Sequence, residues 1–215
     1  FLSAMMVVLR QRFPEAEARA LNADNAATFY LAGHETTANA LAWTLFLLAA
    51  QPDLQEEMAA EAQKALADGA DDVAERVPRL RLFLSESLRL YPPVPRFDRQ
   101  AIGTDRLGNW EVKPGDIVSI WPWLLHRHKK LWDDPDAFDI DRFAGKGGRH
   151  RFQYLPFGAG PRTCGGAQFA TTEALTLLAH CLGQWRFVSV GHPAEPAGMV
   201  TLRPKGGLPL RLERR

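Results

Sequence analysis

The sequence predicts a mainly α-helical protein with small β-sheets. Three observations predict this class: apolar residues recur at helical spacing in long stretches that stop at prolines, the middle of the chain alternates in short pieces between glycines and prolines, and no internal repeat is present. With 215 residues, 46% of them hydrophobic, the chain can bury a substantial core. We find no internal domain boundary and expect residues 1–215 to belong to one domain.

The expected helices follow from the 3.6-residue apolar spacing and end where proline or glycine interrupts it. The long second helix stops at Pro52, and the fourth stops at Pro92. We expect Asp53 to cap the third helix, because its carboxylate can accept hydrogen bonds from free backbone N–H groups and acidic residues follow it. The helices are expected at residues 1–12, from beyond Pro14 to 50, 54–66, 80–90 and 166–182.

Short strands are expected between Val94 and Pro122, where alternating pieces are separated by glycines and by Pro114-Gly115. Strands are also expected to close the chain. We place them at residues 185–190, 198–202 and 208–212.

Charge and cysteine content exclude several classes of protein. The 26 basic and 25 acidic residues leave a net charge of +1, so neither nucleic acid nor an anionic membrane is expected as a partner. Two cysteines, Cys164 and Cys181, are too few for a disulfide framework or a four-thiolate metal site and indicate a reducing, cytoplasmic setting. Residues 28–50 are apolar, but the polar residues within 34–39 favour a buried helix over a membrane span.

The most informative stretch is Phe157-Gly158-Ala159-Gly160-Pro161-Arg162-Thr163-Cys164-Gly165-Gly166, which leads from a loop into a helix. Backbone N–H groups at the helix start, the helix dipole and the cation of Arg162 all favour the thiolate form of Cys164. The glycines let the backbone pass close to a flat ligand. The alternative is a free buried cysteine, which we expect Cys181 to be; the glycines and Arg162 favour a ligand role for Cys164.

This loop resembles the cysteine-ligand loop FxxGxRxCxG of the cytochrome P-450 family, with Gly165 where members more often carry a branched apolar residue or proline. Three further stretches resemble the family in order and spacing: residues 32–37 (AGHETT), 86–89 (ESLR) and 91–99 (YPPVPRFDR). The resemblance implies the C-terminal part of the P-450 fold: a long distal helix, the ExxR helix, the Cys-ligand loop and the following helix. It implies that residues 1–215 are part of a catalytic domain whose N-terminal half is absent.

The cofactor implied by the resemblance is haem b, with Cys164 as the metal ligand. Arg99 and Arg162 would contact its propionates, because a guanidinium matches a carboxylate with its fork of donors. For Arg99, and for Arg96 in the same stretch, the alternative is an ordinary surface arginine. The resemblance assigns the cofactor-binding residues as Phe157, Gly158, Arg162, Cys164, Gly166 and Arg99.

Glu35 and Thr36 are the candidate catalytic residues of the distal helix. Splitting dioxygen consumes protons, and an acid beside a hydroxyl can hold an ordered water relay. Gly33 and the threonines are expected to open the helix locally. Taken alone, the pattern favours threonines bonded to backbone carbonyls and a solvated Glu35; Cys164 downstream favours the relay. The candidate substrate-lining residues are Ala32, Gly33, Val94 and Pro95.

Glu86 and Arg89 are three residues apart on one helix face and can form an ion pair, which in isolation is most often solvated. The resemblance implies instead a buried network joined by Arg142, which fixes the cysteine loop under the haem. Arg142 lies in FDIDRF, which departs from the family's commoner FxPERF at Ile140 and Asp141.

Two further groups of side chains have simpler explanations. The basic loop at residues 145–151, with Lys146, is interpreted as a solvated surface, with docking of an acidic electron donor as the alternative. His126 and His128 fit a structural stretch of the family better than a metal site.

The function implied by the resemblance is a haem-thiolate monooxygenase. It would insert one atom of dioxygen into a small hydrophobic organic substrate, with two electrons from a ferredoxin or a flavoprotein reductase. The alternatives are a peroxide-dependent relative and a truncated haem-binding or inactive fragment. The chain contains no CxxC motif, which disfavours a thiol-based redox protein.

Overall fold

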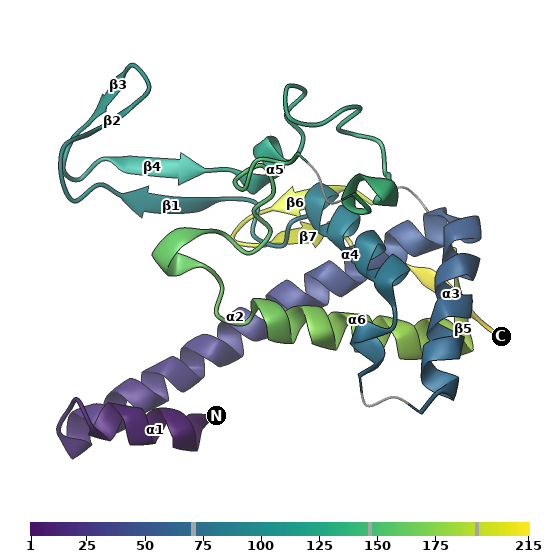
Figure 1. Ribbon diagram of the computed structural model, residues 1–215, viewed down its shortest axis with the longest axis horizontal. Helices are drawn as coiled ribbons and strands as arrows, with labels where there is room; N and C mark the ends of the chain where they lie inside the picture. Colours follow the sequence, from purple (N-terminus) through teal and green to yellow (C-terminus); the bar gives the residue numbers. More distant parts are fainter. Residues whose placement is uncertain (70–71, 146–147, 192–193) are drawn as a thin grey trace.

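The computed structural model describes residues 1–69, 72–145, 148–191 and 194–215, and it is mainly helical with small antiparallel sheets, as expected (Figure 1). The α-helices are α1 (Leu2–Arg10), α2 (Glu15–Ala50), α3 (Pro52–Ala67), α4 (Pro78–Leu90), α5 (Pro122–Leu125) and α6 (Ala167–Gln184), and the 3-10 turns are η1 (Val73–Glu75), η2 (Ile140–Phe143) and η3 (Gly160–Arg162). The strands are β1 (Phe97–Gln100), β2 (Asp105–Leu107), β3 (Trp110–Val112), β4 (Ile117–Ile120), β5 (Trp185–Ser189), β6 (Pro196–Gly198), β7 (Leu202–Pro204) and β8 (Leu210–Arg214).

Helix α2, 36 residues long, crosses the molecule, and its N-terminal part projects from the main body with α1 alongside it (Figure 1). Its C-terminal half packs with α3, α4 and α6 around one hydrophobic core. Leu48, Met58, Phe83 and Leu178 are fully buried there, one from each of these helices. The core therefore joins α2, α3 and α4 to α6, the helix after the cysteine loop.

Each sheet among the described residues is a pair of antiparallel strands. β1 pairs with β4, and the β2–β3 hairpin extends the far end of this pair (Figure 1). β5 pairs with β8, so that Phe187 lies opposite Leu212. β6 and β7 form a short hairpin beside α2.

Prolines mark the helix boundaries as the sequence predicts. α2 ends at Ala50, and α4 ends at Leu90, directly before Tyr91-Pro92-Pro93. The expected N-cap of the third helix is wrong: α3 begins at Pro52, with Gln51 as N-cap and Asp53 inside the first turn. Proline is favoured there because the first helical N–H has no helical partner in any case.

The closing strands differ in part from expectation. A strand at residues 198–202 is wrong, because residues 199–201 form the bend between β6 and β7, where the N–H of Met199 donates to the Thr201 carbonyl over 3.2 Å. The last strand begins at Leu210 rather than at residue 208. The alternation of apolar residues predicts extended chain here, but it does not show where the strands end and the turn begins.

The expected local opening of the distal helix is also absent, because α2 is helical without interruption through residues 33–37.

Across the described part of the chain, the helices lack the combination of length and apolarity that crossing a membrane requires.

Candidate functional site

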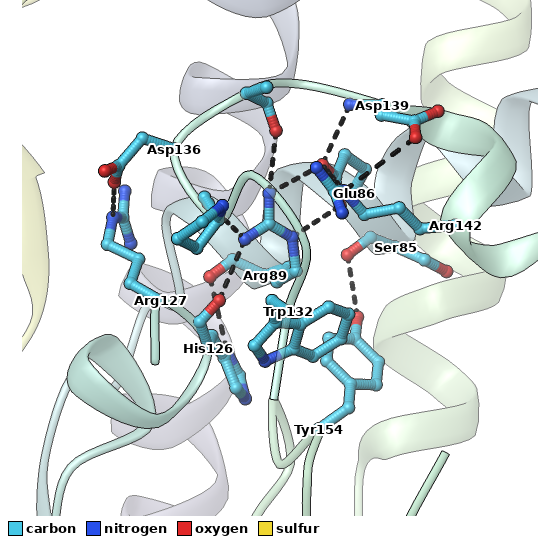
Figure 2. A network of polar contacts seen from close by, with 12 residues as sticks. Ser85, Glu86, Arg89, His126, Arg127, Trp132, Asp136, Asp139, Arg142 and Tyr154 are labelled. Atoms are coloured by element: carbon cyan, nitrogen blue, oxygen red, sulfur yellow. Dashed lines mark hydrogen bonds and ion pairs between the residues drawn. The ribbon is translucent and has the colours of Figure 1, made fainter. Parts of the chain in front are cut away.

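The centre of the site is a buried ion pair on α4. Glu86 and Arg89 are both fully buried, and they form two parallel hydrogen bonds of 2.7 Å, from Nε to Oε2 and from Nη2 to Oε1 (Figure 2). A bidentate arginine–carboxylate pair is the strongest geometry for such an interaction. The i, i+3 spacing on a helix places the two side chains side by side.

Arg89 uses its remaining donors to hold the chain that follows α5. Nη1 donates to the carbonyls of His126 (2.8 Å) and Pro135 (2.6 Å), and Nη2 donates to the carbonyl of Ala137 (2.9 Å). Its guanidinium also lies 5.2 Å from the centroid of the Trp132 ring. The buried charge is thereby fully surrounded by acceptors, which is the condition for burying an arginine without a large penalty.

Arg142 of η2 joins the same carboxylate. Its Nε lies 3.4 Å from Glu86 Oε1, which also accepts the backbone N–H of Asp139 at 2.9 Å. Nη1 and Nη2 of Arg142 donate to the carbonyls of Asp133 and Asp134. The structure thus brings together Glu86, Arg89 and Arg142, the three residues that the resemblance groups into one network (Figure 2).

The network continues to the cysteine loop through His126, which is fully buried. Nε2 of His126 accepts the backbone N–H of Leu155 at 2.8 Å, and Nδ1 lies 3.2 Å from the Arg89 carbonyl. Burial lowers the pKa of His126 to about 4. Next to Leu155, the hydroxyl of Tyr154 donates to the Ser85 carbonyl at 2.9 Å. The Tyr154–Ser85 bond joins α4 to the segment that enters the loop (Figure 2). The Leu155–His126 bond joins the same segment to His126, which faces the Arg89 carbonyl of α4.

The cysteine loop is closed by backbone hydrogen bonds. The N–H of Cys164 donates to the Phe157 carbonyl at 2.9 Å, and Gly158 and Gly160 have φ of +70° and +73°, which side chains rarely adopt. Cys164 is exposed, two residues before Gly166, the N-cap of α6. Cys181, by contrast, is half-buried against the core, and burial raises the pKa of its thiol.

Residues 15–209 match the family model described as Cytochrome P450. The chain belongs to the cytochrome P450 family. Among similar curated proteins, Cytochrome P450 714C3 of Oryza sativa subsp. japonica is 38% identical over 91% of this chain and 40% of the relative. Cyclooctatin synthase of Streptomyces melanosporofaciens is 40% identical over 88% of this chain and 42% of the relative. Echinocystic acid 23-monooxygenase of Saponaria officinalis is 38% identical over 89% of this chain and 38% of the relative. The chain therefore spans about two fifths of the length of these relatives.

The P450 family implies a haem-thiolate cofactor, and the residues of the loop fit one. A thiolate is a suitable axial ligand for haem iron, and the sulfur-bearing side chain is accessible. A Cβ added at Gly166 would lie 3.9 Å from Cys164 Sγ, so glycine leaves the space beside the sulfur free. Phe169, in the first turn of α6, is 73% exposed. Among the described residues, no three His, Cys, Asp or Glu side chains gather as a metal site.

The candidate catalytic residues Glu35 and Thr36 lie in the middle of α2. Thr36 donates its hydroxyl to the Ala32 carbonyl at 2.7 Å, the backbone bond that the sequence alone favours. Glu35 is not simply solvated, because its Oε1 accepts the Thr201 hydroxyl at 2.7 Å and pairs with Arg203 Nε at 2.8 Å. The acid therefore has partners on the β6–β7 hairpin.

The remaining candidates are spread over several elements. Arg162 is exposed in η3, and Arg99 lies on β1 with its Nη1 donating to the Asp98 carbonyl at 2.9 Å. Pro95 is buried and Val94 half-buried after α4, whereas Ala32 and Gly33 are exposed on α2. Lys146 of the basic loop lies outside the described residues.

Sequence reasoning missed four residues that contact the site: His126, Tyr154, Thr201 and Arg203. His126 carried a signal, its place in a stretch that resembles the family, but nothing in the stretch indicated Leu155 as its partner. Thr201 lies in the bend that the sequence assigns to a strand at residues 198–202, and Arg203 follows on β7, so their relation to Glu35 has no local signature.

Proposed function

We propose that this chain is the haem-binding part of a haem-thiolate monooxygenase, with residues 1–215 forming one part of a P450 catalytic domain. The observation that carries the proposal is an accessible cysteine in a glycine-bent loop, joined through Leu155 and His126 to a buried Glu86–Arg89–Arg142 network. The overall reaction would convert a C–H bond, dioxygen, two electrons and two protons into an alcohol and water. The bound haem iron, with its thiolate ligand, would supply the chemistry of dioxygen.

The residues of this chain would divide the other tasks. Cys164 would bind the iron, and the bent backbone at Gly158 and Gly160 would let the loop lie close to the ring. Arg99 and Arg162 would orient the propionates through charge-assisted hydrogen bonds. The buried network would keep the loop from moving, since each of its charges is held by several partners.

Proton delivery would belong to Glu35 and Thr36. The Thr36 hydroxyl donates to the Ala32 carbonyl, which leaves its oxygen free to accept a hydrogen bond from water. Glu35, the next residue towards the N-terminus, can hold and release a proton. This acid and alcohol pair favours a dioxygen-dependent enzyme over a peroxide-dependent relative, which receives its protons with the oxidant.

The substrate would be a small hydrophobic molecule, with Ala32, Gly33, Val94 and Pro95 as candidate contacts. Echinocystic acid 23-monooxygenase and Cytokinin hydroxylase, two relatives of this chain, are named for acting on echinocystic acid and on a cytokinin. We propose a ferredoxin or a flavoprotein reductase as the electron donor.

The test is the carbon monoxide difference spectrum of the reduced protein after incubation with haem. Wild type is expected to show the long-wavelength Soret band of thiolate ligation. Cys164→Ala is expected to lose that band, while Cys181→Ala, which changes a half-buried cysteine of α6, keeps it. Haem uptake by Cys164→Ala with an unchanged spectrum would exclude Cys164 as the ligand, and a wild-type protein that takes up no haem would favour an inactive fragment.

A further inference from the structure

Glu35 is bound to a part of the chain that lies 166 residues away in sequence. Its Oε1 accepts the Thr201 hydroxyl at 2.7 Å, and the same atom lies 2.8 Å from Nε of Arg203. Thr201 is the last residue of the bend between β6 and β7, and Arg203 is the middle residue of β7. A single carboxylate oxygen thus receives a hydroxyl and a guanidinium from one short segment.

That segment is itself held firmly. Leu202, between the two partners of Glu35, donates its N–H to the Pro93 carbonyl at 2.9 Å and accepts the indole N–H of Trp43 at 3.2 Å. Trp43 is fully buried on α2 and stacks on Tyr91, with ring centroids 4.0 Å apart. β7 is therefore anchored to both α2 and the end of α4, and it forms a fixed platform for the Glu35 side chain.

Thr201 also needs its hydrogen bond to Glu35 because its side chain is buried. It is only 5% exposed, and a buried hydroxyl without a partner is costly. Arg203 and Glu35 are 56% and 41% exposed in their side chains, so their ion pair by itself contributes little to the free energy of folding. The pair therefore has more to do with where the carboxylate points than with stability.

Thr36 does not orient the acid in this arrangement, because its hydroxyl proton is directed to the Ala32 carbonyl. A glutamate on a helix surface has three rotatable side-chain bonds, and a hydrogen bond from Thr201 together with the ion pair to Arg203 on one oxygen selects among the rotamers. The other oxygen, Oε2, remains for exchange with water. Glu35 lies on α2, but the orientation of its side chain is determined by the β6–β7 hairpin.

We propose that Thr201 and Arg203 are positioning residues for proton delivery: they hold Glu35 Oε1 so that its carboxyl group stays aligned beside Thr36. This inference rests on the proposed function. If the alignment is lost, protons arrive more slowly and reduced dioxygen leaves as peroxide, by O2 + 2e⁻ + 2H⁺ → H2O2. With proton delivery intact, a larger share of the dioxygen is reduced to water, by O2 + 4e⁻ + 4H⁺ → 2H2O.

The experiment uses the haem-loaded full-length protein with dioxygen as the probe and a plant ferredoxin with its reductase as electron donor, without organic substrate. Peroxide formed per dioxygen consumed is measured for Arg203→Gln and Thr201→Val. We expect the ratio of peroxide to water to rise about threefold to tenfold, a fraction of the roughly 10²- to 10⁴-fold contribution of a positioned proton donor. Arg203→Lys, which keeps a cation, is expected to restore most of the wild-type ratio.

Lys205→Gln is the matched control. Lys205 is a cation two residues beyond Arg203 that pairs with Glu195 at 3.0 Å, and its side chain is 66% exposed. It is expected to keep the wild-type ratio. The Glu35→Gln protein provides the second control: adding Arg203→Gln to it is expected to cause no further change, because Arg203 acts through Glu35.

Two measurements without turnover accompany these assays. The carbon monoxide difference spectrum of Arg203→Gln is expected to match wild type, and a double-mutant cycle of unfolding for Glu35→Gln and Thr201→Val is expected to show coupling between them. Three outcomes would each overturn the positioning role alone. The peroxide-to-water ratio of Arg203→Gln could equal that of wild type, its effect could add to that of Glu35→Gln, or the unfolding cycle of Glu35→Gln and Thr201→Val could show no coupling. A wild-type protein without the thiolate band would overturn the proposed function, and this inference with it.

Discussion

The imidazole Nε2 of His126 accepts the backbone N–H of Leu155 at 2.8 Å, while the other ring nitrogen faces the carbonyl of Arg89 at 3.2 Å. Because an acceptor nitrogen carries no proton, the ring is neutral with its proton on Nδ1, where it can donate to Arg89. One side chain therefore connects the ExxR helix to the chain that enters the cysteine loop, and it does so only while it is uncharged.

This relationship predicts a pH dependence. Burial lowers the pKa of His126 from 6.5 to about 4, so the unfolded chain takes up the proton more readily than the folded one. The contribution of His126 is complete above pH 6.5 and is lost as the pH falls towards 4, at about 1.4 kcal/mol of unfolding free energy per pH unit. Denaturant unfolding at pH 7, 6 and 5 measures it.

His126→Gln is expected to flatten this pH slope, since glutamine does not titrate. His128→Gln is the control, because His128 lies two residues away and is exposed. Equal slopes for wild type and His126→Gln between pH 6 and pH 5 would contradict the assignment.

Arg89→Met is expected to reduce the free energy of unfolding by about 3–5 kcal/mol, because the buried Glu86 carboxylate loses its bidentate partner and, of its two arginines, keeps only Arg142 at 3.4 Å. Arg76→Met removes an exposed arginine paired with Asp72, and it is expected to change stability by no more than about 1 kcal/mol. Chemical denaturation of both variants checks this difference. Similar losses in the two proteins would show that burial of the Glu86–Arg89 pair is not what makes Arg89 important.

Gln55→Leu is expected to destabilise the protein by about 1–3 kcal/mol. The Gln55 amide is buried, where its Oε1 accepts the N–H of Phe187 at 2.7 Å and its Nε2 donates to the carbonyls of Leu48 and Phe187. Leucine can fill the space but leaves these backbone groups unpaired. Gln63→Leu is the comparison, because Gln63 is exposed and makes one hydrogen bond, to the Gly183 carbonyl. Thermal unfolding measures both variants, and a Gln63→Leu protein that is no more stable than Gln55→Leu would refute the prediction.

Two helical glycines are expected to respond oppositely to alanine. A Cβ at Gly33 meets nothing within 4 Å, so Gly33→Ala should stabilise α2 by about 0.5–1 kcal/mol. A Cβ at Gly183 would lie 3.0 Å from Leu66 Cδ1, and crowding between α6 and α3 should make Gly183→Ala destabilising by about 1 kcal/mol. Unfolding midpoints of both variants test the pair, and a shift of the same sign in both would count against it.

Much of the fold was predictable because its signals are local. Pro52 and Pro92 end helices through the missing N–H and the ring geometry of proline, whatever surrounds them. The errors arose where two local signals compete: Asp53 is a good capping residue, but Pro52 before it fits the first helical position. At residues 199–201, alternation indicated a strand although the chain turns there.

The sequence by itself determined the family, the glycine-bent loop around Cys164 and the helical spacing that places Glu86 beside Arg89. Each of these depends on residues close together in the chain. Only the tertiary structure decided that His126 reaches Leu155 and that Glu35 is held by Thr201 and Arg203. The physical reason is that a hydrogen bond requires its partners within about 3 Å, and for residues far apart in sequence that proximity depends on how whole helices and hairpins pack.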